Sequence, residues 1–136
     1  MLEEKPKKRR RRKRAQSFGE RDIEDYLLAN QIEYEREKTF DDCLSRKRRN
    51  LRFDFFLPSY NLLVEFQGRH HYEPVNKKKN ALYTHKKTVL HDGIKKIFAA
   101  ENNIKLLEIG YVDRDKIVEI LNQELGLEYV PLMESK

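Results

Sequence analysis

Two acidic residues stand inside stretches of the sequence that are otherwise typical of buried strands. Asp54 lies within residues 51–57, and Glu65 lies within the apolar run 62–66, with turn-forming residues at 58–61 between them. Carboxylates are rarely buried without a partner, and two of them on adjacent strands repel each other unless a cation lies between them. Because Mg²⁺ takes oxygen ligands, the pair predicts a site for Mg²⁺ or Mn²⁺.

Each carboxylate also has an ordinary structural explanation. Asp54 could pair with Arg52 or Arg69, and Glu65 could point to solvent from a strand with alternating faces. For either residue alone this explanation is the favoured one. The two carboxylates together, followed at once by Gly-Arg-His-His at 68–71, favour a functional site.

This stretch resembles the PD-(D/E)xK nuclease superfamily, whose pattern is an aspartate, a turn, and then Glu-x-Lys at the end of the next strand. Asp54 and Glu65-Phe66-Gln67 match that pattern, with Gln67 in the place of the usual lysine. A longer string resembles the branch that contains the Vsr mismatch endonucleases and the phage-type EDxHD homing endonucleases. It consists of residues 53–58, 64–68, 71–72, 92 and 103–107, and the resemblance covers roughly residues 17–111.

The resemblance implies a metal-dependent DNA endonuclease that hydrolyses phosphodiester bonds. Asp54 and Glu65 would be its metal ligands, with the backbone carbonyl of Phe66 as a third. An ion held there would stabilise charge in the transition state and help to make a water nucleophilic. Gln67 can orient water or a phosphate by hydrogen bonds, but it cannot supply the ammonium of a lysine.

In the resembled branch a histidine and a later aspartate take over from that lysine, and His71 and Asp92 fit the two places. His71 would act as general base or acid, because an unperturbed imidazole titrates near neutrality. His70 is the competing histidine. Asp92 could instead pair with Lys95 or Lys96 on the same helix.

Glu20 has a structural and a functional interpretation. Ser17 fits the N-cap of a helix and Glu20 stands three residues later, as in a capping box. In the resembled nucleases the first helix carries a glutamate, often within Ser-x-Gly-Glu, that faces the metal, and residues 17–20 match that string. The resemblance thus implies that Glu20 binds the metal directly or through water, with Glu24 as the second candidate.

The spacing of apolar residues predicts a helix, three strands, a helix, a strand and a final helix. In chain order the expected ranges are 17 to about 30, 32–40 ended by 41–43, 51–57, 62–66, 76–102 as one helix or two joined near Gly93, 104–109, and 113–125 after a turn. The apolar side of the long helix is expected to be Leu82, Val89, Leu90, Ile94, Ile97 and Phe98. This order predicts an α/β fold, and the resemblance makes it a restriction-endonuclease-like αβββαβ sandwich around a mixed sheet.

The chain has 136 residues, enough for one domain, with 38% hydrophobic and 38% charged residues. The expected organisation is a disordered basic tail at 1–16, a nuclease domain at 17–127 and a loose C-terminal end at 128–136. No apolar segment is long enough for a membrane span or a signal peptide, so no membrane partner is expected. Cys43 is the single cysteine, which excludes an intrachain disulfide and suits a reducing compartment. We therefore expect an intracellular protein of the cytoplasm or nucleoid, or of the nucleus in a eukaryotic host.

Positive charge is concentrated in the tail. Residues 5–14 contain nine of the 29 basic residues, which leaves 20 basic residues beyond residue 14, against 21 acidic ones once Glu3 and Glu4 are set aside. Such a run suits salt-dependent contacts with DNA phosphates, or a nuclear-import signal. A second basic stretch lies at 45–50, just before the Asp54 strand. The residues expected to contact nucleic acid are Lys8, Arg10, Arg12, Arg46, Arg48, Arg49, Arg69 and Lys78.

Three functional hypotheses follow. The leading one is a Mg²⁺- or Mn²⁺-dependent endonuclease whose tail grips double-stranded or branched DNA, with a homodimer left open. The alternative is a non-catalytic nucleic-acid-binding module with a decayed nuclease site, marked by Gln67. The third is a partner-recruitment role in which the tail is only a targeting signal.

Overall fold

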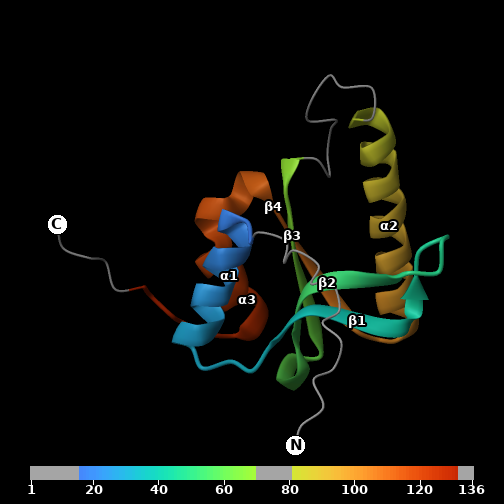
Figure 1. Ribbon diagram of the computed structural model, residues 1–136. Helices are drawn as coiled ribbons and strands as arrows, with labels where there is room; N and C mark the ends of the chain where they lie inside the picture. The colour runs from blue at the N-terminus through green and yellow to red at the C-terminus, as the bar shows by residue number, and fades with distance from the viewer. Residues whose placement is uncertain (1–15, 70–80, 132–136) are drawn as a thin grey trace, which may run out of the picture.

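The structure is a computed structural model of the chain, and it describes residues 16–69 and 81–131. Within these ranges three α-helices and four strands follow one another in the order that the sequence predicts (Figure 1). Their bounds are Phe18–Ala29 for α1, Glu35–Leu44 for β1, Asn50–Leu57 for β2, Leu62–Gln67 for β3, Ala81–Glu101 for α2, Lys105–Gly110 for β4 and Ile117–Leu125 for α3.

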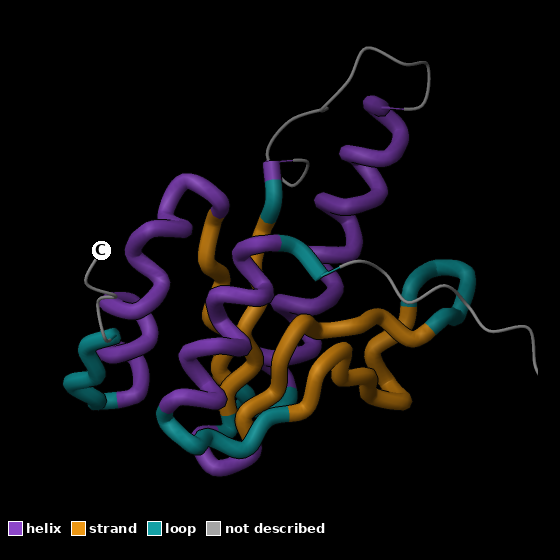
Figure 2. Tube along the Cα trace, turned by 60° about the vertical axis from the view of Figure 1, so that its left-hand side comes forward, coloured by secondary structure: helices purple, strands orange, loops and turns teal. Residues whose placement is uncertain are grey.

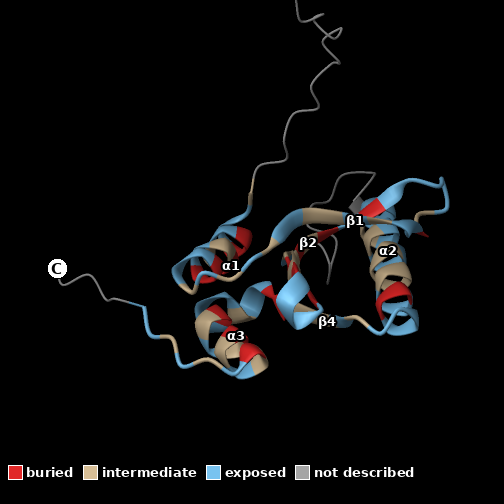
Figure 3. Cartoon of the chain, turned by 90° about the horizontal axis from the view of Figure 1, so that it is seen from below, coloured by how far each residue is buried: buried red, intermediate tan, exposed pale blue. Residues whose placement is uncertain are grey.

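The four strands form one mixed, open sheet in the order β1-β2-β3-β4. β1 pairs antiparallel with β2, and β2 with β3, through short connections. β3 pairs parallel with β4, which requires a crossover, and α2 stands in that connection. Helices α1 and α3 lie on one side of the sheet and α2 lies on the other (Figure 1 and Figure 3). The chain is therefore an α/β protein with a sheet between two helical layers, as predicted at that level.

A cluster of buried side chains lies on each face of the sheet. The cluster on the side of α1 and α3 contains Ile23, Tyr26, Leu27, Phe55, Leu57, Leu62, Val64, Ile109, Ile117, Leu121 and Leu125. The cluster on the side of α2 contains Cys43, Leu51, Phe53, Leu63, Phe98 and Ala99. Burial of these apolar side chains against the sheet is the main favourable contribution to folding.

Strand β2 changes face at its centre. Residues two apart on a strand normally share a face, yet Phe53 belongs to the α2-side cluster and Phe55 to the cluster under α1 and α3. Glu37, which lies between the β1 residues paired with Phe53 and Phe55, has φ 51°, a left-handed conformation that is strained for a residue with a Cβ. The sheet is thus locally distorted around Asp54.

Strand β1 begins and ends later than predicted. The expected range was 32–40 with a break at 41–43, but β1 runs over Glu35–Leu44. It continues because Leu44 pairs with Asn50 after a shift in register, and because Cys43 is fully buried in the α2-side cluster. Ile32 and Tyr34, whose alternation predicted a strand, instead pack against the opposite cluster before the strand begins.

Helix α2 is continuous through Gly93, so the single-helix alternative is confirmed for Ala81–Glu101, while residues 76–80 lie outside the described ranges. Its expected apolar side is only partly correct. Phe98 is buried and Ile94 packs against the α2-side cluster, but the other four side chains are exposed: Leu82 by 55%, Val89 by 50%, Leu90 by 37% and Ile97 by 62%. The N-terminal half of α2 therefore keeps apolar side chains outside its contact with the sheet.

The C-terminal part is more ordered than predicted. Residues 111–116 form two short 3₁₀ turns with a kink at Asp113, so α3 begins at Ile117 rather than 113. Beyond α3, the ring of Tyr129 packs edge-on against Tyr26 with centroids 5.5 Å apart, and the Asn122 side-chain amide donates to the Tyr129 carbonyl at 2.8 Å. The folded part thus extends through Tyr129, past the expected boundary at 127.

None of the helices in the described ranges combines the length and the apolar character needed to cross a bilayer.

Two glycines provide a matched test of the packing between α1 and the sheet. A Cβ on Gly19 would overlap the ring of Phe66, whereas a Cβ on Gly93 would meet nothing within 4 Å. Gly19→Ala is expected to lower the free energy of unfolding by about 1–3 kcal/mol through overpacking. Gly93→Ala is expected to raise it by about 0.5–1 kcal/mol, because alanine favours the helix. Urea unfolding followed by circular dichroism measures both, and equal stabilisation by the two variants would contradict the close packing at Gly19.

Candidate functional site

Asp54 and Glu65 lie where β2 and β3 separate. The paired residues of β2 and β3 end at Phe55 and Val64. Beyond this point β2 continues along β1 through Arg52 and, after the shift in register, to Asn50, and β3 continues along β4 as far as Gln67. Figure 2 shows the β1–β2 pair running away from the β3–β4 pair. The sheet therefore forks at the two carboxylates.

The two carboxylates replace the missing backbone pairing. Asp54 Oδ2 accepts a hydrogen bond from the Phe66 N–H at 2.8 Å, and Glu65 Oε2 accepts one from the Asp54 N–H at 3.3 Å. Each strand thus satisfies a backbone donor of the other with a side chain instead of a carbonyl. A buried backbone N–H needs such an acceptor, so these carboxylates have a structural role as well as a possible chemical one.

The fork is unfavourable for negative charge. The pKa of Asp54 is raised from its ordinary 3.8 to about 7, first by burial and then by repulsion from Glu65 and Glu20. Glu65 is 5% exposed, and burial also raises its pKa, with a further contribution from Asp92. Two carboxylates that resist ionisation at one place favour any cation that binds between them.

Lys95 of α2 partly balances the negative charge at the fork. Its Nζ lies 3.0 Å from Glu65 Oε1, with little of either side chain exposed, and lies 5.3 Å from the centre of the Phe53 ring. This ammonium lowers the pKa of Glu65 but does not outweigh the effect of burial. Lys95 was predicted only as a partner of Asp92 and not as part of the site. The helical spacing of positions 88, 92 and 95 places all three on one side of α2, and this spacing is the signal in the sequence that could have indicated Lys95.

Gln67 follows Glu65 on the same face of β3 and is 8% exposed. Its side-chain amide donates a hydrogen bond to Glu108 Oε2 on the neighbouring strand β4. The other oxygen of Glu108 lies 3.4 Å from Lys96 Nζ. Glu108 could not be predicted from the sequence as part of the site. The parallel register of β3 and β4 places it opposite Glu65, from where its side chain reaches Gln67.

Glu20 enters the site from α1. The structure confirms Ser17 as the N-cap, since the Glu20 N–H donates to Ser17 Oγ at 3.1 Å and the Ser17 hydroxyl donates to Glu20 Oε2 at 3.1 Å. Glu20 is buried, with Arg36 at 3.9 Å from Oε1, and its charge acts on Asp54. The second candidate, Glu24, accepts instead from the Tyr34 hydroxyl at 2.6 Å, and this bond lowers its pKa.

Asp92 lies on α2 close enough to Glu65 for its charge to raise the pKa of Glu65. The structure thus brings Glu20, Asp54, Glu65, Gln67 and Asp92 together from four elements. His70 and His71 lie outside the described residues, so the predicted histidine has no position here. The same holds for Lys8, Arg10, Arg12 and Lys78.

The remaining predicted DNA contacts lie on the surface. Arg46, Arg48 and Arg49 are exposed in the loop between β1 and β2, where Arg48 has φ 60°, and Arg69 is exposed just after β3. These positions agree with the loop expected at 45–50. Among the described residues, no three histidine, cysteine, aspartate or glutamate side chains form a group that could hold a metal ion.

Comparisons of the chain with protein-family models, with curated proteins and with solved structures find no match.

The raised pKa of Asp54 predicts how stability depends on pH. Between pH 3.8 and about 7 the folded chain holds a proton that the unfolded chain releases, so the free energy of unfolding falls as pH rises through this window. The loss is on the order of a few kcal/mol, since one pKa unit corresponds to about 1.4 kcal/mol. Asp54→Asn keeps a side-chain oxygen for the Phe66 N–H and removes the charge. We expect this variant to melt at a higher temperature than the parent at pH 8 and to show a flatter pH profile, measured by thermal unfolding in EDTA. A parent stability that rises between pH 4 and 7 would contradict the assignment.

Proposed function

We propose that this chain is a metal-dependent DNA endonuclease that hydrolyses phosphodiester bonds on a restriction-endonuclease-like αβββαβ fold. The observation that carries the proposal is the pair Asp54 and Glu65, two carboxylates with raised pKa values at the fork between β2 and β3. The order of elements and the mixed sheet support the fold assignment. The resemblance of the site string to the Vsr-like and EDxHD nucleases supports the reaction.

The donors fit a hard divalent cation, Mg²⁺ or Mn²⁺. Asp54 and Glu65 would hold it, with the backbone carbonyl of Phe66 as a third oxygen. Glu20 would act through water, because no three acidic side chains among the described residues form one metal-holding group. The group of ligands is small, which agrees with the tendency of Mg²⁺ to keep several waters and to take phosphate oxygens. Lys95 occupies one oxygen of Glu65 and leaves the charge of the fork unbalanced, so a divalent ion would relieve the remaining repulsion.

When bound, such an ion supplies Lewis acidity and lowers the pKa of water. The residues of the chain would supply the rest. The Lys95 ammonium would stabilise negative charge that develops on the phosphate, a role for which Gln67 is unsuited because its amide donates to Glu108. His71, which lies outside the described residues, would move the proton at the attacking or leaving oxygen. Asp92 would take the place of the later aspartate of the resembled branch.

A second candidate is the non-catalytic nucleic-acid-binding module. The observation that favours it is the ion pair between Lys95 and Glu65, in which an ammonium already provides positive charge at the place proposed for the metal. Gln67 in place of a lysine agrees with a site that no longer reacts. In this case the basic tail and the loop containing Arg46, Arg48 and Arg49 would carry the binding to DNA phosphates.

Cleavage of DNA separates the two candidates. Purified chain is incubated with supercoiled plasmid and with labelled branched DNA, in Mg²⁺ or Mn²⁺ and in EDTA. We expect metal-dependent products whose rate falls at least about a hundredfold in Glu65→Gln, because the variant loses charge at the metal. Glu128→Gln, the same change at an exposed position after α3, is the control and should cleave normally. Cleavage by Glu65→Gln at the parent rate would contradict the proposal that Asp54 and Glu65 form a nuclease site.

Cation binding is tested without any reaction. At pH 8 the melting temperature of the parent should rise by several degrees when EDTA is replaced by Mg²⁺ or Mn²⁺ at a hundred times its dissociation constant, which corresponds to about 2.7 kcal/mol. The rise should be lost in Asp54→Asn and retained in Glu128→Gln. Equal stabilisation of all three proteins would mean that the cation binds elsewhere, and no shift in the parent would favour the non-catalytic module.

A further inference from the structure

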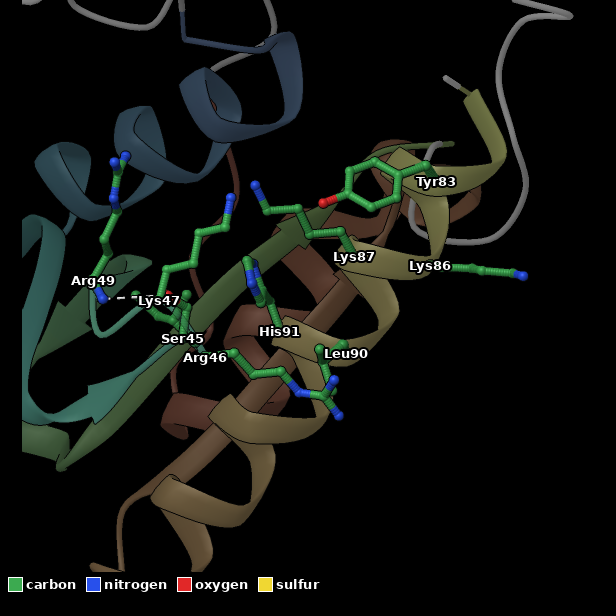
Figure 4. Close-up of a pocket in the computed structure, with 10 residues that line it drawn as sticks. Ser45, Arg46, Lys47, Arg49, Tyr83, Lys86, Lys87, Leu90 and His91 are labelled. Carbon is green, nitrogen blue, oxygen red and sulfur yellow. Dashed lines mark hydrogen bonds between the residues drawn. The ribbon is translucent and has the colours of Figure 1, made fainter. Parts of the chain in front are cut away.

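A groove separates the loop of the β1–β2 hairpin from the N-terminal half of α2 (Figure 4). Its volume is about 480 Å³. The hairpin contributes Arg46, Lys47 and Arg49 to its lining, and α2 contributes Lys86 and Lys87. No carboxylate occurs among the described residues that line it, so a strongly positive potential is expected inside it.

The groove also has an apolar and aromatic surface. Leu51 of β2 and Leu90 of α2 line it, together with Tyr83 and His91. Figure 4 shows Tyr83, Lys87 and His91 projecting from α2 toward the hairpin, with Arg46 extending toward Leu90. Tyr83 is 64% exposed and Leu90 is 37% exposed, so both present apolar area in a groove whose lining also includes cations.

Basic residues on a surface are usually no more than solvated charge, and one exposed tyrosine is ordinary. Here two segments that are about 40 residues apart in sequence combine cations with an aromatic ring in one concave space. Cations bind phosphates, and aromatic rings stack on bases. A ligand that carries both phosphates and exposed base faces makes use of both features.

This combination discriminates between duplex and unpaired nucleic acid. In a duplex the bases are stacked on each other, so only phosphates and base edges reach a protein. In an unpaired strand the base faces are available for stacking. A space of about 480 Å³ has the size of a small-molecule pocket, which suits a nucleotide unit and not a double helix.

The groove and the two carboxylates are built on the same two elements. His91 in its lining is one helical turn before Lys95, which contacts Glu65. Leu51 in its lining is three residues before Asp54 on β2. The groove therefore lies near the fork of the sheet.

We propose that this groove binds an unpaired DNA strand and directs its backbone toward Asp54 and Glu65. The substrates of the proposed nuclease would then be DNA molecules with single-stranded or branched regions. The choice of DNA over RNA and this last step rest on the proposed function, whereas binding of an unpaired strand in the groove does not require cleavage.

The binding test uses the full chain in EDTA and fluorescence anisotropy with three labelled ligands of equal length: oligothymidylate, its duplex with oligoadenylate, and an abasic strand with the same phosphates. Tyr83→Ala should weaken binding of oligothymidylate roughly five- to a hundredfold, the effect of losing one stacked base. It should leave duplex and abasic strand unaffected, because these ligands offer no base face. Tyr60→Ala, at an exposed tyrosine between β2 and β3, is the matched control and should bind all three ligands as the parent does.

The charge of the groove is tested separately. Lys87→Gln should reduce by about one the slope of log affinity against log salt for oligothymidylate, as expected for one phosphate contact. Lys116→Gln, an exposed lysine before α3, should leave the slope unchanged. The proposal would be overturned if Tyr83→Ala lost oligothymidylate and duplex binding equally, or lost neither. It would also be overturned if Lys87→Gln and Lys116→Gln gave the same slope. A labelled oligouridylate that binds more tightly than oligothymidylate would overturn the choice of DNA.

The outcomes keep the two proposals apart. If binding depends on Tyr83 but the chain cleaves no DNA, the proposal for the groove is supported and the nuclease proposal is contradicted. If cleavage depends on Glu65 but Tyr83→Ala binds and cuts every ligand normally, the nuclease proposal is supported and the proposal for the groove is contradicted.

Discussion

The exchange of hydrogen bonds between the Asp54 and Glu65 carboxylates and the backbone of the opposite strand is the constraint on which the site depends. It allows β2 and β3 to part without leaving buried N–H groups unsatisfied. The parted strands then bring residues from three further elements to one place. Glu20 arrives from α1, Lys95 from α2 and Glu108 from β4.

Much of the fold could be predicted from local patterns. The N-cap at Ser17, the turn at 58–61 and the apolar runs of β2 and β3 are all properties of short stretches, and the structure has them where expected. The end of β1 could not be predicted, because the strand continues past the exposed Asp41 and Asp42 to Leu44, which pairs with Asn50 of β2 after a shift in register. The exposure of the N-terminal half of α2 could not be predicted either, because helical periodicity shows which side is apolar but not whether another element covers it.

The candidate site divides in the same way. Asp54 and Glu65 could be predicted as site residues, because each is a carboxylate within an otherwise apolar strand and this pattern is contained in a short stretch of sequence. Lys95 and Glu108 were not visible, because one depends on how α2 lies across the sheet and the other on the parallel register of β4. The groove combines both kinds of information. Its loop was seen as a basic stretch, whereas its partner surface on α2 exists only in three dimensions.

The hydrogen bonds at the fork also affect how the history of this chain can be inferred. A substitution that removes the side-chain oxygen at either position leaves a buried backbone donor without its acceptor, and such a loss costs about 1–3 kcal/mol whatever the chain does. Selection for a folded protein alone would therefore preserve an oxygen acceptor at each position, for which asparagine and glutamine serve as well as aspartate and glutamate. Descendants that had lost all chemical activity would be free to exchange the acids for these amides, so Asp and Glu retained together at the fork would record a need for the negative charge itself.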